Sequence, residues 1–346
     1  MSCGILRVTM QSQTAMNSAK HKVLVANLRP LGEVFNITPE VFGTVGTRYR
    51  QLADKLDITY DYDLERYNSL IGEAEILVGW QFPTDQIKEV APKLKWIHLM
   101  GSGLDQCLPL DWLPENVSLT TSAGAHAVKA GEFMATALMM LNNHVVQFIT
   151  NQNQQHFQSI YSSPIAGKTV VLVGVGGIGG AAADRCKALG MHVIGVRPSK
   201  KRHASVDETV GVEHLNDVLS RADFALISTP LTRDTRGMFG KQQLASMKRG
   251  AGLVNFGRHS IVDEDALIDA LESGHLAGAI MDVENPDQVA WNPRLWTTPN
   301  LLIIPHCVTN DPPNFPSNMI DVFFRNLDGY LRDETMATQV GREREY

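Results

Sequence analysis

The sequence has few cysteines and no closely spaced pair of them. Its four cysteines lie at positions 3, 107, 186 and 307, and no CxxC motif occurs. This pattern argues against a disulfide framework and a zinc site, and it is typical of proteins from a reducing cytoplasm. The eleven histidines show neither HExxH nor another close ligand spacing. We therefore expect no metal site and a cytoplasmic location.

The sequence also lacks an excess of positive charge and a long apolar run. Its formal net charge is -6, whereas nucleic-acid binding requires a strongly basic surface. The longest apolar stretch, near residues 133–141, is far shorter than the roughly 20 residues that cross a bilayer. These absences predict a soluble protein with neither a nucleic-acid partner nor a membrane partner.

Residues 1–21 show no periodic pattern and lack the long apolar core of a signal peptide. We interpret them as a loose leader, with an uncleaved or organellar segment as the alternative.

From Lys22 on, strand-like and helix-like segments alternate along the chain. Strands are expected at 22–28, 74–80 and 95–103, and helices at 39–56, 84–94 and 127–146. Alternation at this spacing predicts a parallel sheet with crossover helices. The polar run at 150–159 is expected to be an exposed connection.

A second alternating series begins at Gly167. Its expected strands are 169–174, 192–197, 224–229, 251–256, 277–283 and 301–306, and its expected helices are 178–189, 215–222, 241–248 and 263–274. This pattern predicts a doubly wound sheet of at least six strands. An amphipathic helix near 319–334 is left over, and we expect it to return to the first domain.

The predicted fold class is therefore α/β, with two Rossmann-like doubly wound parallel-sheet domains. The predicted substrate domain comprises residues 22–125 and 308–346, and the predicted dinucleotide-binding domain comprises residues 126–307.

The stretch "VVLVGVGGIGG" places a G-x-G-x-x-G motif between a strand and a helix. Gly174 allows the tight turn, Gly176 lets a pyrophosphate approach, and Gly179 lets the helix pack on the strand. The helix N-terminus would then hold the phosphate. The alternative is a purely structural turn. We predict a dinucleotide site that also includes Gly177 and Ile178.

The next strand ends at Arg197, where an NAD-binding enzyme usually has an acidic residue. Ser199 and Lys200 follow, with further cations behind them. A guanidinium can hold a 2'-phosphate that a carboxylate would repel. This loop favours NADP(H) over NAD(H), while the other interpretation is an exposed basic loop without function.

Several stretches, in the right order, make the chain resemble the D-2-hydroxyacid dehydrogenase family from Lys22 to Arg332. They are "LISTPLTRDTRGMFG", "GLVNFGRHSIVDEDAL", "GAIMDVENPD" and "RLWTTPNLLIIPH". The stretch "WIHLMGSGLD" is similar in particular to glyoxylate and hydroxypyruvate reductases.

The resemblance implies a role for each residue that matches these motifs. Arg258 would bind the substrate carboxylate, together with the backbone N–H groups of Ser102 and Gly103. His306 would donate a proton to the developing alkoxide, since imidazole titrates near neutral pH. The residues expected to line the cofactor are Thr229, Pro230, Phe256 and Asp282, of which Asp282 faces the nicotinamide. A homodimer with the 127–146 helix at its interface is also implied.

Two positions depart from the family pattern. The catalytic glutamate is replaced by Asp287, whose shorter side chain would reach His306 after a local shift or through a water; Glu284 is the alternative. His259 stands where the family has glycine, and it would either crowd the site or point away from it. Cys307 is adjacent to His306 on an extended segment, so the two side chains point apart and cannot form a nucleophile–base pair.

Taken together, the motifs predict an NADP(H)-dependent oxidoreductase that reduces a small 2-oxo acid to the D-2-hydroxy acid. The competing hypothesis is a scaffold that senses NAD(P)H and binds protein partners with little turnover.

Overall fold

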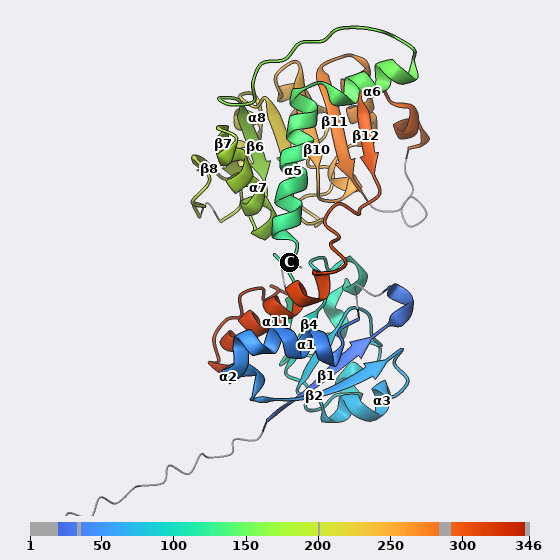
Figure 1. Ribbon diagram of the computed structural model, residues 1–346, viewed down its shortest axis with the longest axis vertical. Helices are drawn as coiled ribbons and strands as arrows, with labels where there is room; N and C mark the ends of the chain where they lie inside the picture. Colours follow the sequence, from blue (N-terminus) through green and yellow to red (C-terminus); the bar gives the residue numbers. More distant parts are fainter. Residues whose placement is uncertain (1–19, 33–35, 200, 284–291, 343–346) are drawn as a thin grey trace, which may run out of the picture.

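The computed structural model of the chain contains two parallel sheets, each covered by helices on both faces (Figure 1). The structure describes residues 20–32, 36–199, 201–283 and 292–342. All but the last two residues of the predicted leader therefore lie outside the described residues. Two sheets of this kind confirm the predicted fold class.

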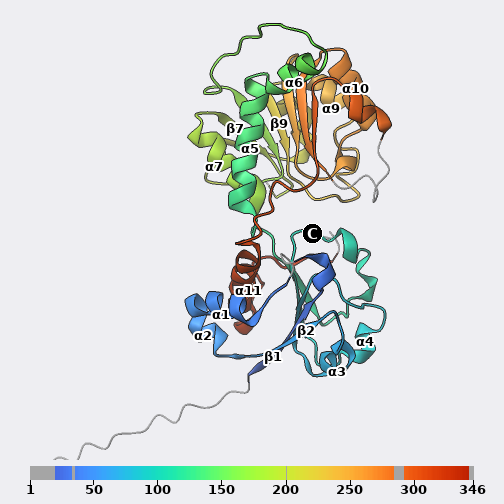
Figure 2. The same cartoon turned by 45° about the vertical axis from the view of Figure 1, so that its right-hand side comes forward.

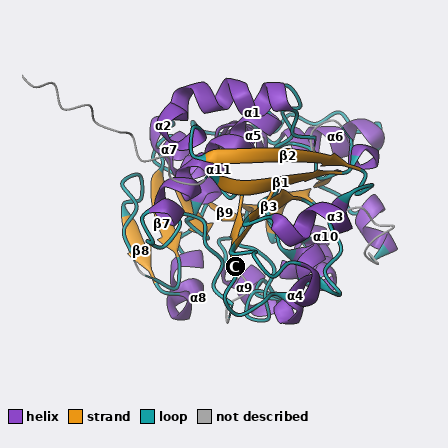
Figure 3. Ribbon diagram, turned by 90° about the horizontal axis from the view of Figure 1, so that it is seen from below, coloured by secondary structure: helices purple, strands orange, loops and turns teal. Residues whose placement is uncertain are grey.

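The first sheet has the strand order β2-β1-β3-β4-β5. Its strands are β1 (His21–Asn27), β2 (Leu56–Tyr62), β3 (Ile76–Gly79), β4 (Trp96–Leu99) and β5 (Ser118–Thr121). Its helices are α1 (Pro39–Gly46), α2 (Arg50–Ala53), α3 (Tyr67–Leu70), α4 (Ile87–Val90) and α11 (Phe315–Leu331). Helices α1, α2 and α11 cover one face, and α3 and α4 cover the other (Figures 2 and 3).

Helix α11 supplies a large part of the first sheet's core although it comes from the end of the chain. Its buried face includes Phe323, Phe324 and Leu327. The Phe323 ring stacks on Trp96 of β4, with 5.0 Å between ring centroids. Phe42 of α1 meets both phenylalanines edge-on. Burial of such aromatic side chains stabilises the fold by about 1.5–3 kcal/mol each.

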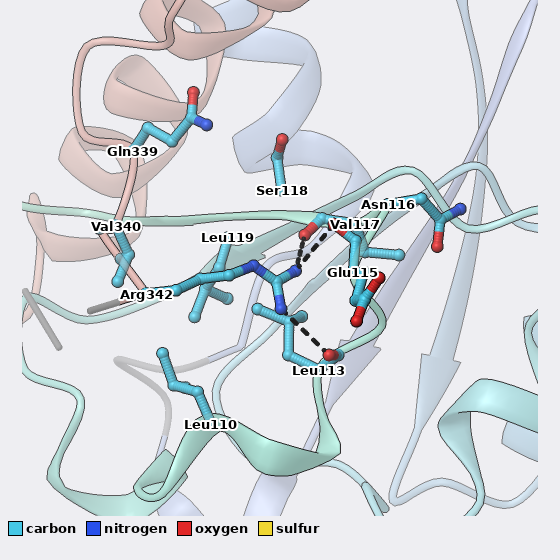
Figure 4. A pocket seen from close by; sticks show the side chains of 11 residues that line it. Leu110, Leu113, Glu115, Asn116, Val117, Ser118, Leu119, Gln339, Val340 and Arg342 are labelled. Carbon is cyan, nitrogen blue, oxygen red and sulfur yellow. Dashed lines mark hydrogen bonds between the residues drawn. The ribbon is translucent and has the colours of Figure 1, made fainter. Parts of the chain in front are cut away.

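The segment after α11 closes the free edge of β5. The Val340 N–H donates to the Leu119 carbonyl at 2.9 Å. The Arg342 guanidinium donates to the carbonyls of Leu113 and Val117, as Figure 4 shows. Beside these contacts lies a cavity of about 450 Å³. None of the predicted site residues lines it, so we do not assign the active site to this cavity.

The second sheet has the strand order β12-β11-β10-β9-β6-β7-β8. Its strands are β6 (Thr169–Val173), β7 (His192–Val196), β8 (Glu208–Val210), β9 (Phe224–Ile227), β10 (Ala251–Asn255), β11 (Leu276–Asp282) and β12 (Leu301–Ile304). Its helices are α5 (Ala127–Asn142), α6 (Val145–Asn153), α7 (Gly177–Ala188), α8 (Leu215–Leu219), α9 (Lys241–Ser246) and α10 (Glu264–Glu272). The strand order reverses between β6 and β9, the position at which such sheets bind nucleotides.

Strand β6 shows why the second sheet is enclosed on both sides. Val170 and Leu172 point into the core under α5 and α7, while Val171 and Val173 point into the core under α8, α9 and α10. A parallel strand buried on both faces needs apolar residues at every position. This requirement explains the continuous apolar run before the glycine motif.

The chain crosses between the two sheets twice (Figure 1). Residues 122–126 lead from β5 into α5, and residues 305–314 lead from β12 into α11. The crossings touch, because His126 has a hydrogen bond with the Thr309 backbone, and its ring centroid lies 4.4 Å from that of Phe315 at the start of α11. Gly124 in the first crossing also packs against Gly177 at the start of α7. The glycine motif is therefore in contact with the connection between the sheets.

All six strands expected in the second series are present, with β8 as a seventh. Strands β2 and β5 were not predicted. The expected helix at 127–146 is present as α5 up to Asn142, but the chain breaks at His144, whose φ is 57°. A separate helix, α6, then extends into the polar run that was expected to be a connection. None of the helices in the described ranges is long and apolar enough to span a bilayer.

Candidate active site

The glycine motif forms a tight turn between β6 and α7. Gly174 has a φ of +94°, which favours glycine, and its N–H donates to the Val196 carbonyl at 2.9 Å. A Cβ on Gly179 would overlap the Gly174 carbonyl oxygen, so the third glycine lets the helix approach the strand. A Cβ on Gly176 would have no neighbour within 4 Å. The space in front of Gly176 and the α7 N-terminus therefore fits a dinucleotide pyrophosphate.

The loop after β9 lies against the same turn. Ser228 donates from its hydroxyl to the Gly174 carbonyl at 2.7 Å, and a Cβ on Gly174 would lie 2.8 Å from the Thr229 methyl group. The Thr229 Oγ1 is buried, and no hydrogen-bond partner for it occurs among the described residues. A buried hydroxyl normally has a partner, so a bound dinucleotide fits this position. Pro230, next in the chain, is exposed.

Arg197 directly follows β7, and Pro198 and Ser199 come next, so arginine holds the position where an acidic residue was the alternative. Its side chain is half-buried, and its Nη1 donates to the Lys201 carbonyl at 3.3 Å. The guanidinium thus folds over the predicted cofactor loop. Ser199 is exposed in this loop, and Lys200 lies outside the described residues.

The loop after β10 holds Arg258 through a buried amide. Asn255, fully buried at the end of β10, donates from Nδ2 to the Arg258 carbonyl at 2.9 Å and accepts from the Gly257 N–H at 3.0 Å. The Arg258 side chain is half-buried, whereas the adjacent His259 is buried at the start of a short 3-10 helix. Phe256 packs towards Phe133 of α5, with 6.1 Å between ring centroids.

His306, the second residue of the second crossing, has an unusual backbone conformation. Its φ is 46°, which is costly for a residue with a side chain, and its N–H donates to the Ile304 carbonyl at 2.9 Å. Its Nδ1 lies 3.5 Å from Oδ2 of Asp282. The Asp282 side chain is 2% exposed, whereas that of His306 is 43% exposed. The imidazole is thus oriented by a buried carboxylate and remains accessible from solvent.

Sequence reasoning expected a different carboxylate beside His306. Asp282 was assigned to the nicotinamide, while Asp287 and Glu284 were the candidate partners of the histidine; both of these lie outside the described residues. The structure brings Asp282 to His306 because β11 and β12 are neighbours, with Asp282 in register with Ile304. This pairing depends on strand register, which the sequence does not display.

A second histidine near His306 was also missed. His126 ends the first crossing and packs against the Phe315 ring at a tilt of 44°. Burial lowers the pKa of His126, a hydrogen bond with the Thr309 backbone raises it, and the charge of His306 lowers it further. The two imidazoles are therefore close enough to influence each other electrostatically. In the sequence, the one signal that could have pointed to His126 is its position directly before a long helical pattern.

The turn after β4 carries Ser102 and Gly103, which are half-buried. The Ser122 N–H donates to the Gly101 carbonyl at 2.8 Å, which ties this turn to the first crossing. A Cβ on Gly101 would overlap the Trp80 ring, so the indole lies directly on the turn. Within the described ranges, no group of three histidine, cysteine or acidic side chains could hold a metal ion.

These residues provide the parts needed to move a hydride and a proton. The glycine turn and Thr229 can hold a dinucleotide, Arg258 can hold an anion, and His306 with Asp282 can exchange a proton. They lie at strand ends of the second sheet and in the connections to the first. Ser102 and Gly103 lie at a strand end of the first sheet.

Known proteins show the same organisation. Residues 135–308 match the family model described as D-isomer specific 2-hydroxyacid dehydrogenase, NAD binding domain. A glyoxylate reductase from Thermococcus gammatolerans is 33% identical over 267 residues, which cover 75% of this chain and 79% of that protein. A D-3-phosphoglycerate dehydrogenase from Methanocaldococcus jannaschii is 31% identical over 247 residues, which cover 68% of this chain and 46% of that protein.

A solved structure shares the fold over nearly the whole chain. It is the D-isomer specific 2-hydroxyacid dehydrogenase from Xanthobacter autotrophicus Py2 in complex with NADPH and MES. The TM-score is 0.75 at 24% sequence identity, and the match covers 95% of this chain and 100% of that one.

Proposed function

Because the chain belongs to the D-isomer specific 2-hydroxyacid dehydrogenase family of NAD(P)-dependent oxidoreductases, we propose that it reduces a small 2-oxo acid to the D-2-hydroxy acid with NADP(H). The observation that carries this proposal is the His306 imidazole, half-exposed and 3.5 Å from the buried Asp282 carboxylate. A carboxylate beside an imidazole stabilises its protonated form. Protonated imidazole is the form that can donate to an alkoxide.

Each site residue then has a defined task. The dinucleotide, when bound, supplies the hydride. Arg258 binds the substrate carboxylate in a two-pronged interaction, and the N–H groups of Ser102 and Gly103 bind the same carboxylate from the other side. His306 donates its proton to the substrate oxygen. Asp282 orients the imidazole of His306. We propose that the Asp287 carboxylate also pairs with this imidazole.

The proposal is tested by following NADPH and NADH absorbance with glyoxylate, hydroxypyruvate and phenylpyruvate as substrates. We expect turnover of at least one of them, faster with NADPH. Failure of every substrate with both cofactors would contradict the proposal. Tight NADPH binding without turnover would instead support a sensing scaffold.

The preference for NADP(H) is proposed from the end of β7. Arg197, Ser199 and Lys200 would bind the 2'-phosphate, because arginine directly follows β7 in place of the acidic residue that would accept from a free ribose hydroxyl. The remaining contacts to the cofactor are assigned to the glycine turn with Gly177 and Ile178, to the loop at Thr229 and Pro230, and to Phe256.

Substituting Arg197→Asp is expected to raise KM for NADPH by about 10- to 100-fold, because a hydrogen bond to a charged group contributes about 1.5–3 kcal/mol. KM for NADH should change far less, since NADH has no 2'-phosphate. Steady-state kinetics with both cofactors measures the two values. Arg50→Asp, which reverses a charge at the exposed start of α2, is the matched control. Equal losses for both cofactors would show that Arg197 does not contact the 2'-phosphate.

Two alanine substitutions in the glycine motif should separate folding from cofactor binding. Gly179→Ala forces a methyl group into the Gly174 carbonyl and should destabilise the protein by about 1–3 kcal/mol. Gly176→Ala places its methyl group in open space, so the unfolding temperature without cofactor should stay unchanged while the stabilisation by NADPH is lost. Thermal unfolding with and without NADPH measures both. Full stabilisation of the Gly176 variant by NADPH would refute the assigned cradle.

We also propose a homodimer formed around α5 and the segment that follows it. Apolar side chains exposed here include Val128 and Met139 on α5, Phe148 on α6, and Phe157 and Tyr161 after it. A monomer rarely exposes such a concentration of apolar side chains. Sedimentation analysis of the protein and of a Phe157→Ser, Tyr161→Ser variant tests this, with a dimer expected for the first and a monomer for the second.

We propose that residues 22–125 and 308–346 form the substrate domain and that residues 126–307 form the dinucleotide-binding domain. Limited proteolysis should cut first near 125 and 308 if these are the boundaries.

We also propose a cytoplasmic location from the cysteine usage, and cell fractionation tests it.

A further inference from the structure

We propose that His98 is a positioning residue for the substrate-carboxylate turn at residues 101–103, acting through Ser122. The proposal rests on the function proposed above for Ser102 and Gly103. His98 lies in β4, is fully buried, and was not among the residues singled out from the sequence.

The His98 ring has a hydrogen-bond partner at each nitrogen. Its Nδ1 lies 2.8 Å from Thr120 Oγ1, and its Nε2 lies 3.1 Å from Ser122 Oγ. Trp96 Nε1 donates to the same Thr120 hydroxyl at 2.8 Å. The Ser122 hydroxyl in turn donates to the Leu99 carbonyl at 3.0 Å. These contacts form one continuous polar chain inside the core.

One assignment of donors and acceptors satisfies all four hydrogen bonds of this chain. The indole of Trp96 can only donate, so Thr120 accepts from it. The Thr120 proton then goes to His98 Nδ1 at 2.8 Å, which is closer than the Ile97 carbonyl at 3.5 Å. Ser122 uses its proton on the Leu99 carbonyl, so it accepts from His98 Nε2–H. Burial lowers the pKa of His98 to about 3, while a hydrogen bond with the Met319 backbone opposes that shift. The ring is therefore neutral near pH 7 and carries the single proton that this assignment requires.

Ser122 is the link between this chain and the turn. Its N–H donates to the Gly101 carbonyl at 2.8 Å, and its carbonyl accepts from the Ser102 hydroxyl at 3.4 Å. Ser122 also begins the first crossing between the sheets. Fixing the Ser122 side chain therefore fixes both the turn and the start of that crossing. A buried chain of polar groups destabilises the fold unless every group has a hydrogen-bond partner. The last residue of this chain, Ser122, has its backbone partners in the turn.

Two substitutions at one position separate positioning from packing. The His98→Gln side chain can place its amide near the Nε2 position and keep the Ser122 contact. The His98→Asn side chain is shorter, so it can reach Thr120 but loses Ser122. We expect KM for the 2-oxo acid to rise about 10-fold in the Asn variant, equivalent to about 1.4 kcal/mol. In the Gln variant KM should stay near the wild-type value, and KM for NADPH should be unchanged in both.

Ser122→Ala is the second test and does not alter the imidazole. It should raise KM for the 2-oxo acid as His98→Asn does, with kcat changing less than KM. Binding of oxalate to the NADPH complex, measured by calorimetry, gives the same comparison without turnover. Unfolding temperatures of all variants provide the structural reference.

The outcomes distinguish this inference from the proposed function. An active wild-type enzyme whose KM is unaffected by His98→Asn and Ser122→Ala would overturn the inference alone. Equal KM increases in the Asn and Gln variants, in step with their unfolding temperatures, would reduce His98 to a packing role. A wild-type protein that neither turns over a 2-oxo acid nor binds oxalate would overturn the proposed function first, and the inference with it.

Discussion

Replacing His306 by glutamine is expected to lower kcat for 2-oxo acid reduction by about 10²- to 10⁴-fold, the range for loss of a general acid. Glutamine can fill a similar volume and form hydrogen bonds, but it cannot release a proton near neutral pH. The wild-type imidazole is half-exposed, so substrate can reach it, and it lies beside the buried Asp282 carboxylate, which stabilises its protonated form. The substitution removes this proton donor. Steady-state kinetics measures the effect, and fluorescence titration should show unchanged NADPH binding.

The control for this result is His156→Gln, which changes an exposed histidine after α6. Its kcat should equal that of the wild type. A His306→Gln variant whose kcat lies within a few-fold of the wild-type value would show that His306 is not the proton donor.

Asp282→Asn keeps the shape of the partner of His306 but removes its charge. We expect its loss of kcat to be smaller than that of His306→Gln.

Replacing Arg258 by lysine is expected to lower kcat/KM for the 2-oxo acid by about 10²-fold or more, because a point charge cannot reproduce a two-pronged guanidinium–carboxylate interaction. Each hydrogen bond to a charged group contributes about 1.5–3 kcal/mol. Most of the loss should fall on KM, since the substrate carboxylate is bound in both the ground and the transition state. Kinetics at saturating NADPH measures it.

Arg249→Lys is the matched control, because Arg249 is exposed in the turn before β10 and outside the proposed site. The unfolding temperature of the Arg258 variant should stay near that of the wild type, since Asn255 holds the loop through the backbone. A variant with unchanged KM for every 2-oxo acid would show that the substrate carboxylate binds elsewhere.

Much of the fold could be predicted because its strands are continuous apolar runs. Apart from β8, the strands of the second sheet have apolar side chains on both faces, and the glycine motif marks the start of α7. Strand β2 was missed because it lies at an edge and alternates apolar with polar residues, and β5 because it is short and half polar. The break before α6 was missed because His144 adopts a positive φ without being glycine.

The site was predictable where it depends on local motifs and not where it depends on register. Gly174, Gly176 and Gly179 lie in one turn, as the motif requires. The proximity of Asp282 to His306 arises from the pairing of β11 with β12. His98 and Ser122 meet because β4 pairs with β5. A histidine inside an apolar strand was the only available signal for that network.

The position of α11 has a consequence for how the protein is made. Its phenylalanines complete the core of a sheet whose strands all lie before residue 122. During synthesis from the N-terminus, that sheet emerges first but lacks one covering layer until residue 331 has left the ribosome. The sheet between residues 169 and 304 is continuous in sequence and can close earlier. The half of the protein that is translated first is therefore expected to reach its native state last.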